Sequence, residues 1–180
     1  MVGPETEAAA RFRSSALLGG ADEGVKRALL DVLVEERFPA GAVLMEQGAP
    51  NDRLVFLMAG TASVIRTRPD GRAEAMATFT APTVFGTTSF FRAGAVPTFG
   101  VRAAGDVTLL SLTRADHERL RKTHPAAAEA LALDALKTLS DRFDELDRLF
   151  NDYIARHPDD HPKVTEWSGF RARLFEEHGI

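Results

Sequence analysis

Turn-forming residues recur at short intervals through the middle of the chain, and this feature limits the fold more than any other. The apolar runs between them are too short for helices and have the length of β-strands. Many short strands within about 75 residues indicate a small sandwich, barrel or roll. The turns fall at Pro39–Gly41, Gly48–Asp52, Gly60, Pro69–Gly71, Pro82, Gly86, Gly94 and Gly105.

The clearest of these turns is Pro69-Asp70-Gly71, which separates the apolar segments Ser63–Arg66 and Ala75–Phe79. Proline presets the first backbone angle of a turn, and glycine readily takes the left-handed conformation that follows. The sequence therefore predicts a β-hairpin with its tip at Asp70.

Helical patterns lie on both sides of the strand-rich region. Residues 1–20 are rich in alanine and glycine, so we expect a loose arm or a short helix there. From Asp22 the apolar residues follow the spacing of one helix face, and we expect that helix to end near Pro39. The apolar positions are Val25, Ala28, Leu29, Val32 and Leu33.

A second helical region begins after Leu112, with Thr113 as its expected N-cap and Asp116 three residues later. A break at His124-Pro125 precedes a longer helix that is expected to reach about Ala155. One face of this helix has the 4-3 spacing of a coiled coil, so we expect a homodimer. The alternative is that the face packs on its own β-domain. The predicted dimer residues are Leu136, Leu139, Phe143, Leu146, Phe150 and Tyr153.

Composition excludes several classes of function. The 180-residue chain contains no cysteine, which removes disulfides, thiolate metal sites and cysteine nucleophiles. Its net charge is −4 and its arginines are scattered among acids, so the sequence lacks the clustered positive charge that nucleic-acid binding needs. It has no apolar run near the ~20 residues that span a bilayer and no signal-like start. We therefore expect a cytoplasmic protein without a membrane partner.

The order of segments and several motifs resemble the cyclic-nucleotide-binding family. Gly41–Gly48 and Asp52–Gly60 are similar to its glycine-punctuated strand pair, Phe85-Gly86 to the start of its phosphate-binding cassette, and Val101–Leu112 to the strands that close its roll. The resemblance implies an α+β, mainly β fold: a cyclic-nucleotide-binding-type β-roll with an N-terminal helix and a long C-terminal helix. The expected parts are an arm (1–16), the roll (17–124), the long dimerisation helix (125–156) and a tail (157–180).

The resemblance also locates a candidate ligand pocket, whose recognition residues differ from the family pattern. In the family a glutamate after the Phe-Gly step accepts from the ribose hydroxyl, and an arginine after a later proline pairs with the phosphate. Here Thr87 occupies the glutamate position and Thr98 the arginine position, and Pro82 stands where a glycine is usual. The expected pocket residues are Phe85, Gly86, Thr87, Thr88, Ser89, Pro97, Thr98 and Phe99.

This pocket is expected to bind a cyclic nucleotide weakly or not at all. Losing a charged hydrogen bond costs ~1.5–3 kcal/mol, and losing the partner of a buried phosphate costs ~2–5 kcal/mol. Together these losses correspond to roughly three to six decades of affinity. Arg92 and Arg102 are the candidate substitutes for the missing guanidinium, although Arg92 lies in a loop and Arg102 at a strand position that faces away in the family.

No other motif predicts chemistry. His157 and His161 flank two aspartates, but Pro158 and Pro162 make a shared helix face improbable, so we expect a solvated hinge, no metal site and no cofactor. His117 is expected to be a partly buried structural histidine. The Phe90-Phe91 pair could stack on a planar ligand, but packing against the roll is the more frequent use of such a pair.

The predicted function is that of a non-catalytic regulatory or adaptor protein that acts through protein partners or an atypical ligand. No grouping of nucleophile, base and orienting residue suggests an enzyme. The residues after the long helix are too few, and too acidic, for the helix-turn-helix domain of transcription factors in the family, so no DNA binding by this chain alone is expected. The alternative is a cyclic-nucleotide sensor with rearranged phosphate contacts.

Overall fold

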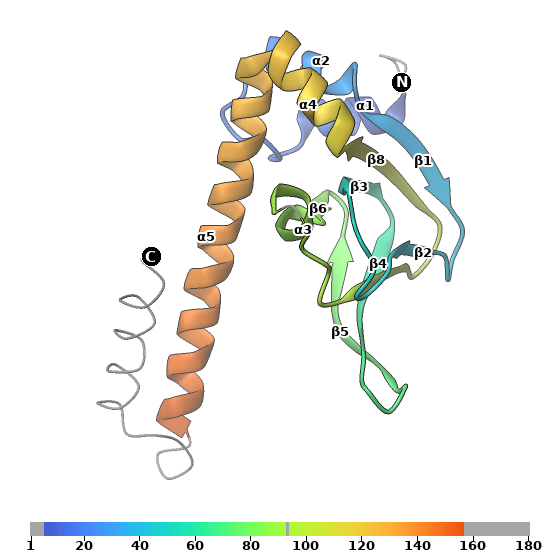
Figure 1. Cartoon of the computed structure of the whole chain (residues 1–180), viewed down its shortest axis with the longest axis vertical. Helices are drawn as coiled ribbons and strands as arrows, with labels where there is room; N and C mark the ends of the chain where they lie inside the picture. Colours follow the sequence, from blue (N-terminus) through green and yellow to red (C-terminus); the bar gives the residue numbers. More distant parts are fainter. Residues whose placement is uncertain (1–5, 93, 157–180) are drawn as a thin grey trace. The chain divides into compact units, whose positions relative to one another are not determined.

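The computed structural model describes residues 6–92 and 94–156, which form eight strands and five helices (Figure 1). The strands are β1 (Val34–Phe38), β2 (Val43–Met45), β3 (Arg53–Ala59), β4 (Thr61–Thr67), β5 (Ala73–Thr80), β6 (Thr83–Phe85), β7 (Gly100–Ala103) and β8 (Val107–Thr113). The helices are α1 (Glu7–Ser14), α2 (Glu23–Leu30), α3 (Thr87–Phe91), α4 (Arg114–Thr123) and α5 (Pro125–Arg156).

The strands form two four-stranded antiparallel sheets, with strand orders β1-β8-β3-β6 and β2-β7-β4-β5. Residues of both sheets share one core cluster, which includes Leu57 of β3 and Val101 of β7. The alternate residues of β3, such as Phe56, belong to a second cluster with the helices. Because β3 is buried on both faces, its sequence is a nearly continuous apolar run. The predicted mainly-β roll with an N-terminal helix and a long C-terminal helix is confirmed.

The region before α2 contains a short helix, one of the two alternatives that the sequence left open. Thr6 caps α1 by accepting a hydrogen bond from the backbone N–H of Ala9. Phe12 is buried and meets the ring of Phe56 edge-on, with 5.3 Å between ring centroids. Helix α1 is therefore part of the main core.

The helix predicted from Asp22 to near Pro39 is shorter than expected, and that prediction was wrong for its second half. Asp22 does cap α2, but the helix ends at Leu30. Residues 34–38 instead form β1 and pair with β8 along its length. The apolar spacing that indicated a helix stops at Leu33, and the remaining Val-Glu-Glu-Arg-Phe segment satisfies its backbone groups in the sheet.

The predicted hairpin is confirmed as the turn between β4 and β5. The backbone N–H of Gly71 donates to the carbonyl of Arg68 at 2.9 Å, and that of Arg68 donates to the carbonyl of Arg72 at 2.9 Å. Gly71 has a φ of +82°, in the left-handed region that the turn requires.

The predicted start of α4 is also confirmed. The hydroxyl of Thr113 accepts from the backbone N–H of Asp116 at 3.1 Å and donates to its carboxylate at 2.7 Å. Helix α4 ends before His124, and Pro125 is the first residue of α5, where its missing N–H is tolerated. The break between the two helices lies where the sequence placed it.

The chain divides into two compact units, residues 1–136 and 137–180. Four of the predicted dimer residues have exposed side chains on α5: Leu136, Leu139, Phe143 and Leu146. Phe150 and Tyr153 also belong to α5, but their side chains lie outside the described part of the chain, as do His157, His161 and the tail 157–180. Across residues 6–92 and 94–156, no helix is both long and apolar enough to cross a membrane.

Candidate functional site

The candidate cassette begins where β6 passes into the short helix α3. Phe85, the last residue of β6, is buried and stacks on Phe79 of β5, with 5.8 Å between ring centroids and 10° between the planes. Gly86 caps α3 with a φ of +85°. A Cβ at this position would lie 2.7 Å from the carbonyl oxygen of Arg53, so only glycine lets β6 turn into α3 this closely against β3.

The three hydroxyl residues after Gly86 differ in their surroundings. Thr87, at the predicted glutamate position, is 3% exposed, and its Oγ1 is buried without a hydrogen-bond partner among the described residues. Thr88 is exposed. Ser89 is buried, and its hydroxyl donates to the carbonyl of Gly86 at 3.1 Å and accepts from Asn51 Nδ2 at 2.8 Å. This part of the cassette is therefore neutral, and one of its buried hydroxyls is unsatisfied.

At the far end of the cassette, the buried residue is Pro97 and not Thr98. Pro97 is buried, and its carbonyl accepts from the backbone N–H of Gly48 at 2.8 Å. Thr98 and Phe99 are exposed. The structure thus buries Phe85, Thr87, Ser89 and Pro97 of the eight predicted pocket residues, and leaves Thr88, Thr98 and Phe99 at the surface.

Neither arginine considered as a substitute points inward. Arg92 is exposed immediately after α3. Arg102 is exposed on β7 between the buried residues Val101 and Ala103, so its side chain lies on the outer face of the sheet. The predicted outward orientation of Arg102 agrees with this geometry.

Sequence reasoning missed Arg53, the first residue of β3. Arg53 Nη2 donates to Glu36 Oε2 and to Ser111 Oγ, the latter at 2.6 Å, and Ser111 Oγ donates to Glu36 Oε2 at 2.7 Å. Val55, two residues along β3, lies directly opposite Ser111. These three polar residues therefore share the inner face of their sheet with the apolar core.

The guanidinium of Arg53 is thus engaged by a carboxylate. Its Nε is nevertheless buried without a partner among the described residues, as is Thr87 Oγ1. The sequence signal that could have found it is an arginine at the head of an otherwise apolar strand.

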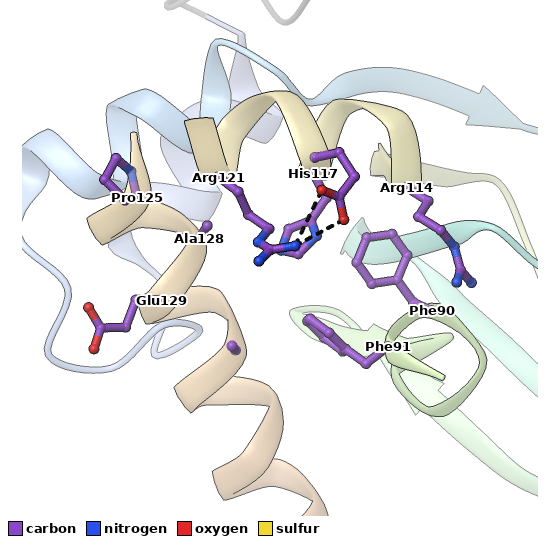
Figure 2. Close-up of a pocket in the computed structure, with 10 residues that line it drawn as sticks. Phe90, Phe91, Arg114, His117, Arg121, Pro125, Ala128 and Glu129 are labelled. Atoms are coloured by element: carbon purple, nitrogen blue, oxygen red, sulfur yellow. Dashed lines mark hydrogen bonds and ion pairs between the residues drawn. The ribbon is translucent and has the colours of Figure 1, made fainter. Parts of the chain in front are cut away.

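A cleft of about 720 Å³ lies beside α3, between that helix, α4 and the start of α5 (Figure 2). Phe90, Phe91 and His117 form a cluster of edge-on rings, with centroid separations of 5.1, 5.4 and 5.7 Å. Phe90 packs into the core as predicted, whereas Phe91 is 40% exposed. His117 is partly buried, and this burial lowers the pKa of its imidazole from the ordinary value of 6.5.

The neighbouring charges act on the same histidine in opposite directions, with Glu118 raising its pKa and Arg121 lowering it, both less than burial does. Arg121 Nη1 lies 3.2 and 3.3 Å from the carboxylate oxygens of Glu118. Arg114 donates to the carbonyl of Ser89 at 3.0 Å, and its guanidinium lies 6.0 Å from the ring centre of Phe90. Helix α4 is thereby tied to the cassette.

Comparison with known proteins identifies the family of this chain. The family model of the cyclic nucleotide-binding domain matches residues 35–124, which is half of the chain. The chain therefore belongs to the cyclic nucleotide-binding domain family. No curated protein sequence matches it significantly.

Solved structures agree with this assignment. The catabolite activator protein of Thermus thermophilus is 25% identical with a TM-score of 0.62; the match covers 75% of this chain but only 63% of that one, less than two thirds of its length. A cyclic nucleotide-binding domain from Methylobacillus flagellatus is 21% identical with a TM-score of 0.68, and the match covers 81% and 78% of the two chains.

A third structure is similar in fold. It is the regulatory subunit of a cAMP-independent protein kinase A from Trypanosoma brucei, with 22% identity and a TM-score of 0.57 over 74% of this chain and 49% of that one. That protein was solved as a triple mutant, including a threonine-to-arginine substitution, with cAMP bound in its A site.

Proposed function

We propose that this chain is a non-catalytic regulatory or adaptor domain that does not bind cyclic nucleotides in the manner of its family. It would act through protein partners or an atypical ligand. It would act as a homodimer formed through α5 and would not bind DNA by itself. The observation that carries the proposal is the neutral cassette around the buried Thr87.

The cassette offers no charge to a cyclic phosphate. Thr87 supplies a buried hydroxyl where the family has a carboxylate, and the inward residue at the far end is Pro97. A hydroxyl donates one neutral hydrogen bond, whereas a guanidinium forms a charge-assisted fork with a phosphate. Bringing a phosphate to this site would therefore remove it from water without a compensating cation.

The nearby arginines do not supply the missing cation. Arg92 and Arg102 are exposed, and Arg102 lies on the outer face of its sheet. Arg53 is on the inner face but is bound by Glu36 and Ser111. Moving Arg53 to a phosphate would leave the Glu36 carboxylate, which is 27% exposed, without its partner.

The Trypanosoma brucei kinase subunit supports the idea that a domain of this fold can work without cAMP. That protein is described as cAMP-independent, and cAMP was bound after its triple substitution. By analogy, the present scaffold could keep a regulatory role after losing its charged recognition residues. The alternative function remains a cyclic-nucleotide sensor with rearranged phosphate contacts, for which Arg53 is the best-placed guanidinium among the described residues.

Isothermal titration calorimetry of the purified full chain with cAMP, cGMP and a cyclic dinucleotide separates the two functions. The proposal predicts no saturable heat at physiological nucleotide concentrations for any of the three. Saturable binding that Arg53→Met, Arg92→Met or Arg102→Met abolishes, in a variant whose thermal melt shows that it is still folded, would establish the sensor instead.

A further inference from the structure

We propose that the cleft between α3, α4 and the start of α5 is a binding site for a small aromatic carboxylate. The cleft lies outside the predicted nucleotide pocket, since none of the eight residues predicted for that pocket lines it. Its volume of about 720 Å³ falls within the range of small-molecule sites. The inference does not depend on whether the roll interior holds a ligand.

The floor of the cleft is aromatic. Phe91 and His117 stand almost perpendicular, with 88° between their planes and 5.7 Å between their centroids. Figure 2 shows both rings directed into the space between α3 and α5. Phe91 leaves 40% of its surface exposed there, while its neighbour Phe90 is 2% exposed. A planar ring placed against Phe91 would cover this surface and meet His117 edge-on, which is a favoured aromatic geometry.

The wall formed by α4 supplies a cation. Arg121 lines the same cleft as His117 and Phe91, and Figure 2 shows its side chain extending from α4 into this space. Its ion pair with Glu118 uses Nη1, and the two side chains are 60% and 55% exposed. Such exposed pairs contribute little to stability, so a carboxylate ligand could bind the remaining guanidinium nitrogens without a large penalty.

The remaining charged residues that line the cleft are Arg114, which donates to the carbonyl of Ser89, and Glu129. Glu129, the acid on the α5 wall, extends away from the rings in Figure 2. His117 has a pKa lowered by burial, so it is neutral at neutral pH and does not repel either sign of charge. A cationic aromatic ligand would meet the guanidinium of Arg121, which is unfavourable. Because Arg121 also pairs with Glu118, its single positive charge balances a ligand with one carboxylate better than a doubly charged phosphate.

The test uses the full chain and four matched probes: indole-3-acetate, its neutral amide, the cation tryptamine and the non-aromatic cyclohexylacetate. We expect saturable binding of indole-3-acetate by calorimetry, and at least about tenfold weaker binding of the other three, because each lacks either the charge or the ring. Amide chemical shifts from a labelled sample should change first around Phe91 and His117.

Two variants and one control locate the site. Arg121→Gln and Phe91→Ala should each weaken indole-3-acetate binding by about tenfold or more. Arg66→Gln, a matched loss of an exposed arginine on β4, should leave it unchanged. The proposal is overturned if the folded chain shows no saturable binding of indole-3-acetate, if the amide binds as well as the acid, or if Arg121→Gln binds like the unmodified chain.

Discussion

Introducing the carboxylate and the guanidinium that the family resemblance assigns to the cassette should create cyclic nucleotide binding, if the cassette backbone forms a phosphate cradle. The first turn of α3 presents backbone N–H groups that have no partner inside the helix, and Gly86 sets their direction. The double substitution Thr87→Glu with Thr98→Arg supplies the carboxylate and the guanidinium. We also propose Thr87→Glu with Pro97→Arg, because Pro97 is buried and Thr98 is exposed.

The expected gain follows from the interactions restored. The ribose contact contributes ~1.5–3 kcal/mol and the phosphate pair ~2–5 kcal/mol, which together correspond to three to six decades in Kd at about 1.4 kcal/mol per decade. The arginine alone should contribute more than the glutamate alone, since a lone carboxylate repels the phosphate. Thr87 is 3% exposed, so the single Thr87→Glu variant should also be less stable than the double variant with an inward arginine.

Calorimetric titration with cAMP, paired with a thermal melt of each variant, measures both effects. The double variant that binds identifies which residue occupies the arginine position. The reasoning is refuted if both double variants keep the thermal stability of the parent chain and neither binds cAMP. The stacked rings of Phe79 and Phe85, or a collapsed loop before Pro97, would then have closed the cavity.

Three further predictions concern stability and assembly. Because burial lowers the pKa of His117 below 6.5, the unfolded chain takes up a proton at this residue first as pH falls, so His117 stabilises the fold above that pH and loses the effect below it. In denaturant titrations, His117→Phe should reduce the fall in the free energy of unfolding below about pH 6.5, and an unchanged pH profile would contradict the assignment. Phe12→Ala should lower the free energy of unfolding by ~3–5 kcal/mol, and a loss below about 1 kcal/mol would mean that α1 is not part of the core. Light scattering at micromolar concentration should give a dimer mass that Leu146→Asp reduces to a monomer, whereas a monomeric parent chain would exclude the α5 dimer.

The fold was largely predictable because its signals are local. The Pro69-Asp70-Gly71 turn, the Thr113 cap and the His124-Pro125 break each depend on a few adjacent residues, and the structure places all three where the sequence indicated. The length of α2 was not predictable in the same way. Residues 34–38 adopt a strand because they pair with residues 107–111 of β8, far along the chain, and periodicity alone does not report such a contact.

The candidate site was only partly predictable, for a similar reason. Gly86 and Thr87 could be located from the motif, but the burial of Pro97 and the exposure of Thr98 depend on how the loop returns to Gly48. The Arg53 cluster joins side chains from β1, β3 and β8, and the aromatic cleft joins α3, α4 and α5. Neither grouping is visible as a spacing in the sequence, because the tertiary fold assembles both.

The central claim is that the cassette of this chain does not hold a cyclic nucleotide, and amide NMR tests it at the residues concerned. A labelled sample of the unmodified chain would be titrated with cAMP to millimolar concentration while the amide signals of Gly86, Thr87 and Thr88 are followed. The account predicts no saturable shift at these three amides. A saturable shift at micromolar cAMP, centred on them, would contradict it and establish a working nucleotide pocket.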